Sequence, residues 1–426
     1  MMKKISFPGK MLRFSWMLLF TGLFSSCLKS SDSPIQPSKS IPFTGISIVP
    51  SLAAQPSLKL FNKAFNRLGL PAIMDSVKGY TIFALTDSAM TAQGLTETII
   101  GSLPVDSLRK LITYQIVEGL LDEPSLMKSV GTLSLTTLKQ DTVQNPTGSF
   151  GLNKAILFVK ETEDFHFNGL PVAKGGAPVQ CSNGYIYPVT QLAANLPTLT
   201  TYDVISSDPD LSMFNRALII GDSLRNIDIL SVFGLEDTLA MDVGILSRPA
   251  NGPYTQGCPW TVLAPTNKAF NDAGFYTDDD IVQYALSTYT GVDLDTYFSW
   301  HYSRLDSVLK HHILFNYNTA AASPLLNITR IFYYDMLDPS INNGILNNFD
   351  GYGVGSDLNT YYGLKLQIPL TFSAMNGDVY VQWSPDPSVP KALLPRDVSP
   401  LHPQNNFITS NGALYKIDKL FYPVVN

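Results

Sequence analysis

Hydrophobic and polar residues form one pattern twice along the chain. In each copy an apolar run of six residues is followed by Thr and then by Asp or Asn. The copies are residues 80–87, ending in Thr86 and Asp87, and residues 260–267, ending in Thr266 and Asn267. Such a run is typical of a buried strand, and a side-chain oxygen just after it caps the free N–H groups of a following helix. Each copy therefore predicts a strand followed by a capped helix.

Three further segments repeat in the same order. A helical pattern begins at residues 60–64 and again at 213–217, and the segment 111–117 corresponds to 308–314. Ser-Asn-Gly precedes an alternating apolar run at 182–189 and at 410–418. Asn-Gly before such a run is a strong hairpin signal. The repeat predicts two globular units, residues 46–198 and residues 199–426.

The repeated segments resemble those of the fasciclin domain. The match is best in residues 260–270, Trp-Thr-Val-Leu-Ala-Pro-Thr-Asn-Lys-Ala-Phe, and the first copy departs from the family at Leu85 and Gln115, where the family has Pro and His. The resemblance covers about 380 residues. It implies an α+β fold of two tandem fasciclin-like domains, each a wedge-shaped β-sandwich packed with helices. It also implies a non-enzymatic protein of cell adhesion that binds proteins or glycans without a cofactor.

The second copy is enlarged, because its matching motifs lie farther apart by a total of 75 residues. Long insertions on a compact scaffold usually run over the surface and often carry binding residues. Here they are rich in Tyr and Trp, whose rings stack on sugars and anchor protein interfaces. The alternative is that most of these rings fill an extended core. We predict ligand-binding roles for Trp300, Tyr302, Tyr361, Tyr362 and Trp383.

Composition and charge narrow the class of protein. The chain is 45% hydrophobic and only 15% charged, which excludes a disordered or coiled-coil protein. Residues 1–26 resemble a signal segment that is removed on export. The remaining chain has 25 basic and 35 acidic residues, and this negative net charge disfavours nucleic acid as a partner. Cys181 and Cys258 could pair, but buried free thiols are the favoured interpretation.

The N-terminal segment has the features of a bacterial lipoprotein signal. Residues 1–26 join basic residues to a short apolar core, and small residues precede Cys27. This pattern resembles the lipobox, with Phe24 where Leu is usual, so we predict a lipid on Cys27 that anchors the chain to the outer membrane. An ordinary signal would leave Cys27 as an unexplained thiol. Residues 27–45 are rich in Ser and Pro and predict a flexible tether.

Catalytic and metal sites are the weaker interpretations. Gly-Asp-Ser-Leu at 221–224 matches a serine-esterase signature, but no Asp lies three residues before any histidine, and the apolar spacing places Ser223 within a helix. His301, His311 and His312 have no metal-binding spacing. The resemblance places His312 in the core as a buried, hydrogen-bonded residue. We predict no catalytic residue and no metal.

These inferences combine into one prediction. The chain is expected to be a surface or periplasmic lipoprotein that binds envelope or extracellular proteins or glycans. An accessory glycan-binding protein of an outer-membrane uptake system is the alternative of the same class. Repeated Asp-Ser or Asp-Thr steps before an aliphatic residue resemble the O-glycosylation acceptors of Bacteroidetes-like bacteria, which favours that origin.

Overall fold

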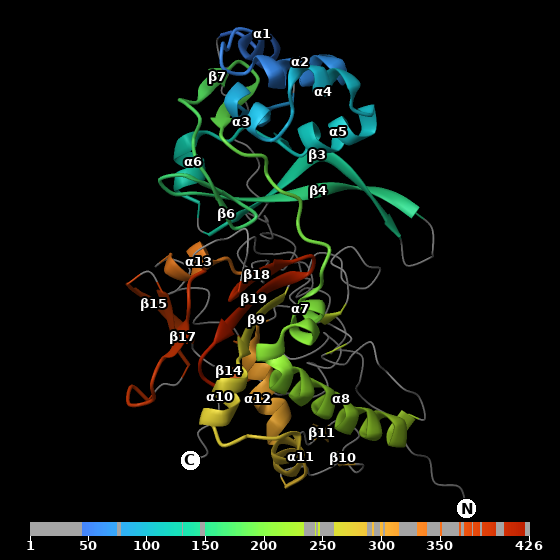
Figure 1. Ribbon diagram of the computed structural model, residues 1–426, viewed down its shortest axis with the longest axis vertical. Coiled ribbons are helices and arrows are strands. Elements are labelled where there is room, and N and C mark those ends of the chain that lie inside the picture. The colour runs from blue at the N-terminus through green and yellow to red at the C-terminus, as the bar shows by residue number, and fades with distance from the viewer. Residues whose placement is uncertain are drawn as a thin grey trace, which may run out of the picture.

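The chain is a mixed α+β structure in two halves, which we call the first half (45–198) and the second half (199–421) (Figure 1). The computed structural model describes residues 45–74, 78–129, 131–144, 150–233, 243, 246–247, 260–287, 292–293, 299–300, 303–314, 330–338, 350–351, 366–367, 370–376, 378–383, 386–397 and 404–421.

The first half is built on an eight-stranded sheet with the order β6-β5-β4-β3-β2-β1-β8-β7. Its strands are β1 (Tyr80–Leu85), β2 (Ile116–Glu118), β3 (Leu133–Gln144), β4 (Phe150–Glu161), β5 (Phe165–Phe167), β6 (Leu170–Val172), β7 (Val179–Cys181) and β8 (Gly184–Val189). Its helices are α1 (Ile48–Ala53), α2 (Lys59–Arg67), η1 (Leu70–Ile73), α3 (Asp87–Ala92), α4 (Glu97–Ser102), α5 (Val105–Thr113) and α6 (Glu123–Met127).

The second half contains a four-stranded sheet, β12-β9-β19-β18, a three-stranded sheet, β15-β16-β17, and two short strand pairs. Its strands are β9 (Trp260–Pro265), β10 (Val292–Asp293), β11 (Ser299–Trp300), β12 (Ile313–Leu314), β13 (Asp350–Gly351), β14 (Leu366–Gln367), β15 (Thr371–Met375), β16 (Asp378–Gln382), β17 (Ala392–Leu394), β18 (Asn406–Thr409) and β19 (Gly412–Ile417). Its helices are α7 (Thr201–Ser207), η2 (Pro209–Leu211), α8 (Ser212–Phe233), α10 (Asn267–Asp272), α11 (Asp278–Ser287), α12 (Arg304–His312) and α13 (Tyr333–Leu337).

The internal repeat is visible in the pairing of the strands. In the first half β2-β1-β8-β7 are neighbours in that order, and in the second half β12-β9-β19-β18 are neighbours in the same order. The parallel pair has the same register in both, because Tyr80 lies opposite Gly184 and Trp260 lies opposite Gly412. The predicted strand and capped helix are confirmed in each copy, as β1 with α3 and as β9 with α10.

The hydrophobic core is divided between the halves. One cluster draws its residues from Ile48 to Ala193. Alternate residues of β9 and β19 feed two clusters in the second half, so that Val262 packs on the helical side and Leu263 packs on the side of β15–β17. This alternation follows from the two-residue period of a strand, and it buries the four-stranded sheet on both faces.

The hairpins predicted at the two Asn-Gly steps are present in both halves. Cys181 pairs with Gly184, and Thr409 pairs with Gly412, so each loop consists of Ser and Asn while the glycine begins the next strand. The glycine is required because a Cβ at Gly184 would lie 1.9 Å from the Tyr80 carbonyl oxygen. Among the described helices, none is both long and apolar enough to cross a membrane.

Candidate functional site

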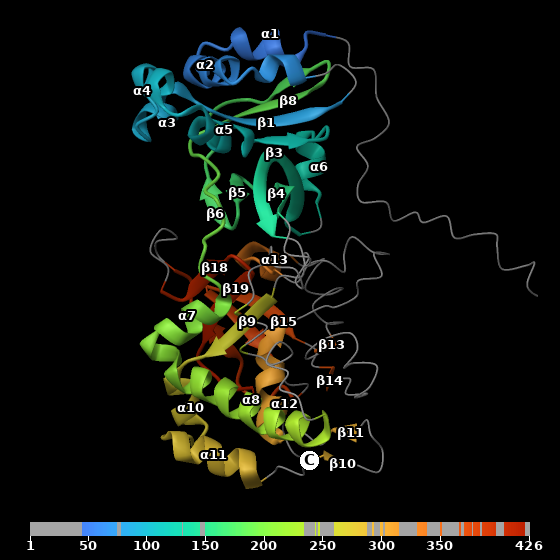
Figure 2. The same ribbon diagram turned by 90° about the vertical axis from the view of Figure 1, so that its right-hand side faces the viewer.

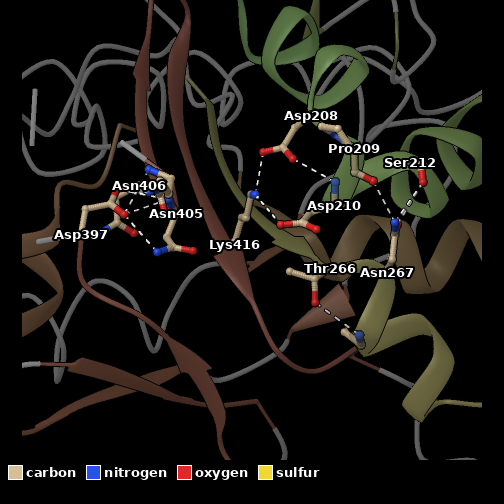
Figure 3. A network of polar contacts seen from close by, with 12 residues as sticks. Asp208, Pro209, Asp210, Ser212, Thr266, Asn267, Asp397, Asn405, Asn406 and Lys416 are labelled. Atoms are coloured by element: carbon tan, nitrogen blue, oxygen red, sulfur yellow. Dashed lines mark hydrogen bonds and ion pairs between the residues drawn. The ribbon is translucent and has the colours of Figure 1, made fainter. Parts of the chain in front are cut away.

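The threonine that follows each central strand caps a helix. Thr86 Oγ1 accepts a hydrogen bond from the N–H of Ala89 at 3.3 Å. Thr266 Oγ1 accepts one from the N–H of Ala269 at the same distance (Figure 3). These bonds satisfy one of the free N–H groups in the first helical turn. Both threonines therefore have a structural role at this position.

The next residue ties the same corner to a second helix. Asp87 Oδ1 accepts the N–H of Leu60 at 2.8 Å, at the start of α2. Asn267 Oδ1 accepts the N–H of Met213 at 2.9 Å, and its Nδ2 donates to the Pro209 carbonyl oxygen at 2.8 Å (Figure 3). Asp87 and Asn267 can occupy equivalent positions because the contact that they share, with a backbone N–H at the start of a helix, needs only an acceptor oxygen.

His312 is buried among backbone groups of the second half. Its Nδ1–H donates to the Leu263 carbonyl oxygen at 2.9 Å, and Nε2 accepts the N–H of Phe421 at 3.0 Å. Burial, aided by the neighbouring His311, lowers the pKa of the imidazole to about 3, so the ring is neutral at physiological pH. In the first half Gln115 Oε1 accepts the N–H of Ala193 at 3.1 Å in the same place.

This equivalence gives a stability prediction. His312→Ala should lower the free energy of unfolding by roughly 2 to 4 kcal/mol, because two buried backbone groups lose their partners. His312→Gln should cost about half as much, because Gln115 shows that an amide can accept the corresponding N–H. Urea unfolding of the two variants checks this, and equal losses would contradict the role given to the hydrogen bond.

A charged cluster distinguishes the second half from the first. Lys416 Nζ lies 2.7 Å from Asp208 Oδ2 and 3.1 Å from Asp210 Oδ2 (Figure 3). The repeat places Pro188 where the second half has Lys416. The lysine is buried, whereas the Asp210 side chain is 72% exposed. These two ion pairs connect the segment between α7 and α8 to the end of β19, and the Asp210 carboxylate remains at the surface.

Asp397 forms a second polar cluster beside β18. Its carboxylate accepts N–H groups of Gln404, Asn405 and Asn406 at 2.8 to 3.2 Å, and also the Asn405 side-chain amide (Figure 3). These donors satisfy the carboxylate within the chain itself. Both clusters in Figure 3 therefore stabilise turns, and neither presents a base or nucleophile aimed at a substrate.

The predicted aromatic ligand residues are only partly within the described structure. Trp383 follows β16, and its ring stacks on Phe421, with centroids 5.4 Å apart and planes 20° apart. One face of the indole ring therefore packs in the core. This agrees with the alternative interpretation, in which most of these rings fill an extended core. Trp300 is the last residue of β11, but the structure does not describe its side chain. Tyr302, Tyr361, Tyr362 and Cys27 lie outside the described residues.

The catalytic alternative finds no support in the surroundings of Ser223. The residue lies within α8, as its spacing predicted, and its Oγ donates to the Ile219 carbonyl oxygen at 2.7 Å. Asp222 Oδ2 accepts the N–H of Val243 at 2.8 Å and so holds a neighbouring segment. Neither contact resembles a nucleophile paired with a base.

The described residues hold no group of three or more His, Cys, Asp or Glu side chains placed to bind a metal ion. Cys181 is a buried free thiol, and Cys258 lies outside the described residues. Asp280 accepts the N–H groups of Tyr276 and Thr277, and so caps the start of α11. His301 lies outside the described residues.

A contact between the halves is the feature that the sequence did not predict. α13 lies at the boundary in both views, against the part of the first half that contains β4 to β6 (Figures 1 and 2). Phe332 packs on Phe158 with ring centroids 5.4 Å apart, and Tyr334 packs on His166. Tyr334 was among the aromatic residues of the enlarged half, and here its ring makes a contact within the chain.

No protein-family model matches this chain, and no curated protein matches it. One solved structure to which it is similar is a FAS1 domain pair from the insect cell adhesion molecule fasciclin I. That match has 12% identity and a TM-score of 0.30, and covers 87% of this chain and 97% of that chain.

Proposed function

We propose that this chain is a fasciclin-like protein of the cell envelope that acts by binding proteins or glycans, in adhesion or in capture at the cell surface. The observation that carries the proposal is the internal repeat. The segments that resemble the fasciclin domain are the ones whose strand order, register and capping contacts recur in both halves. Each half is then a fasciclin-like domain, with a sandwich of strands packed against helices.

The polar residues of the described structure favour binding over catalysis. The side chains at the repeat positions Thr86, Asp87, Thr266, Asn267 and His312 all bind backbone groups of their own half. A fold alone does not define a function, so ligand recognition is assigned to parts that differ between the halves. We place it in the aromatic insertions of the second half, at Trp300, Tyr302, Tyr361 and Tyr362.

A lipid on Cys27 would supply the anchor, and residues 27–45 would supply the tether that holds both domains away from the outer membrane. A lipid-anchored chain would keep its ligand site at the membrane surface, which suits adhesion and capture. If the ligand is a glycan, the protein would serve as the accessory component of an uptake system, which the richness of the insertions in Tyr and Trp favours.

The test is binding of the full chain, kept in mild detergent, to an array of glycans and of extracellular and envelope proteins. The double variant Trp300→Ala/Tyr361→Ala should weaken saturable binding at least about tenfold, because aromatic anchors carry most of the energy of such interfaces. Tyr276→Ala is the matched control, because Tyr276 is an aromatic residue that is 70% exposed but lies between α10 and α11, on the repeated scaffold.

Two results would contradict the proposal. Absence of saturable binding to any protein or glycan would remove the function itself. Equal binding by the double variant, the control and the unmodified chain would move the site from the insertions to the scaffold. Trp383 should be tested separately as Trp383→Phe, which retains a ring to stack on Phe421.

A further inference from the structure

The contact between the halves is centred on a short stretch of the second half, residues 330–338, which contains α13. The aromatic part of this contact is Phe332. Its ring packs on Phe158 and covers Gly169 in the turn between β5 and β6. A Cβ added to Gly169 would lie 2.8 Å from Phe332 Cδ1. Phe332 is itself fully buried, so its ring has little freedom to move aside.

Arg330 extends this aromatic contact. Its guanidinium lies over the Phe158 ring at 4.8 Å, and Nη2 donates to the carbonyl oxygens of Thr409 and Ser410 at 3.1 and 3.0 Å. The residue thus joins the β18–β19 hairpin of the second half to a strand of the first half. A buried guanidinium held by carbonyl groups and an aromatic face keeps these elements in one fixed arrangement.

Charged and polar groups form the rest of the contact. Lys160 Nζ lies 3.1 Å from Asp338 Oδ2, and Thr132 Oγ1 donates to Asp335 Oδ1 at 2.8 Å. The other oxygen of Asp335 accepts the N–H of Phe332 at 2.9 Å. Because Asp335 is fully buried, this carboxylate depends on the first half for one of its partners.

The first half contains the counterpart of α13 without these contact residues. Tyr187 Oη donates to the Leu121 carbonyl oxygen, and Tyr415 Oη donates to that of Ile331, both at 2.8 Å, so α6 and α13 occupy equivalent positions. The contact residues Phe332, Tyr334, Asp335 and Asp338 therefore correspond to Asp122, Pro124, Ser125 and Lys128. The counterpart α6 is also acidic, at Asp122 and Glu123, but it has no aromatic residue, so the aromatic residues of α13 are explained by the contact with the other half.

We propose that α13 is a latch that holds the two halves as one rigid unit, and that it can release them from each other without unfolding either half. The function of such a latch is geometric, because it fixes the direction in which the second half faces relative to the first. The inference depends on the contacts at residues 330–338 and does not require the binding function proposed above.

The test is zero-length carbodiimide cross-linking of the full chain in mild detergent, followed by peptide mass spectrometry. The Lys160–Asp338 pair reports the closed latch, with side chains 8% and 18% exposed. The Lys416–Asp208 pair is an internal reference within the second half, with nearly the same exposures of 7% and 16%, and it is read in an Asp210→Asn background because the exposed Asp210 carboxylate also lies 3.1 Å from Lys416 Nζ. The ratio of the two cross-linked peptides therefore measures the latch at matched accessibility.

Gly169→Ala should lower the Lys160–Asp338 cross-link at least about fivefold and leave the Lys416–Asp208 cross-link unchanged. Gly94→Ala is the matched control, because Gly94 has a φ of +75° against +82° at Gly169, with nothing within 4 Å of an added Cβ. It introduces the same backbone strain without the contact to Phe332. Thr132→Val, which removes only the hydrogen bond to Asp335, should give a smaller loss of the same cross-link.

Three outcomes would overturn the latch. The first is absence of the Lys160–Asp338 cross-link in the unmodified chain when the reference cross-link forms. The second is equal behaviour of Gly169→Ala and Gly94→Ala. The third is loss of both cross-links together in Gly169→Ala, since that would mean that the halves separate only when the chain unfolds.

Discussion

His166→Gln and Asp335→Asn are expected to change the pH dependence of stability in opposite directions between about pH 6.5 and pH 4. Both residues are buried in the contact between the halves, His166 from the first half and Asp335 from the second. Burial lowers the pKa of His166 to about 4, and burial raises the pKa of Asp335 to about 6. Their effects on unfolding are therefore opposed.

The sign follows from which state holds the proton. As the pH falls below 6.5, the unfolded chain protonates His166 while the folded chain does not, so His166 costs stability progressively until about pH 4. As the pH falls below about 6, the folded chain protonates Asp335 before the unfolded chain does, so Asp335 adds stability until about pH 3.8. Each effect amounts to about 3 kcal/mol, and in the unmodified chain they largely cancel.

Lys160 is a neighbour of both groups. Asp164 and a hydrogen bond with the Lys160 backbone favour a proton on His166, whereas the charges of Arg396 and Lys160 disfavour it. Lys160 also favours the ionised form of Asp335, as do the N–H of Phe332 and the hydroxyl of Thr132. The interactions that shift each pKa do not include the other group, so each substitution tests one titration.

The measurement is urea unfolding of both variants and of the unmodified chain at pH 4, 5, 6 and 7. Relative to the unmodified chain, His166→Gln should gain about 3 kcal/mol as the pH falls from 7 to 4, and Asp335→Asn should lose about as much. Comparison at each pH removes the contribution of all other carboxylates. Parallel curves for the three proteins would show that neither group is held in the buried contact.

The local elements follow from the sequence because local contacts specify them. A buried run followed by Thr and Asp or Asn is sufficient to predict β1 with α3 and β9 with α10, since the capping bonds span only three residues. The apolar spacing likewise predicts α8 around Ser223. In these segments propensity, capping and burial all favour the same structure.

Contacts between distant segments explain what the sequence could not supply. Phe332 meets Phe158 and Gly169 across more than 160 residues, and no spacing within either segment indicates the other. The burial of Asp335 likewise involves a hydrogen bond from Thr132, which lies 203 residues away in the sequence. One signal was nevertheless present, because aligning α13 with α6 reveals aromatic residues that have no counterpart in the first half.

The Asn-Gly motif shows how a correct element can be predicted for the wrong reason. The turn preference of Asn-Gly predicts a hairpin with these two residues in the loop. In the structure Asn183 and Asn411 instead turn their side-chain oxygens to the N–H groups of Ile48 and Thr201, each at 2.8 Å, which caps the first helix of each half. The Asn of the motif therefore lies in the hairpin loop and caps a helix, and its Gly allows two strands to pair closely.

Gly184→Ala should consequently be among the most destabilising single-methyl substitutions in the first half. The added Cβ would lie 1.9 Å from the Tyr80 carbonyl oxygen and 2.6 Å from Ile48 Cδ1. The oxygen belongs to the backbone of β1, so relief requires the parallel pair of β1 and β8 to separate. We expect a loss of about 3 kcal/mol or more in the free energy of unfolding.

Gly101→Ala is the matched control, with the opposite sign expected. Gly101 lies within α4, where an added Cβ would have nothing within 4 Å, and alanine stabilises a helix relative to glycine by up to about 1 kcal/mol. Urea unfolding followed by circular dichroism would measure both variants. If Gly184→Ala were as stable as Gly101→Ala, the glycine would be explained by turn preference alone, and the close approach of β1 to β8 would lose its role in fixing the motif.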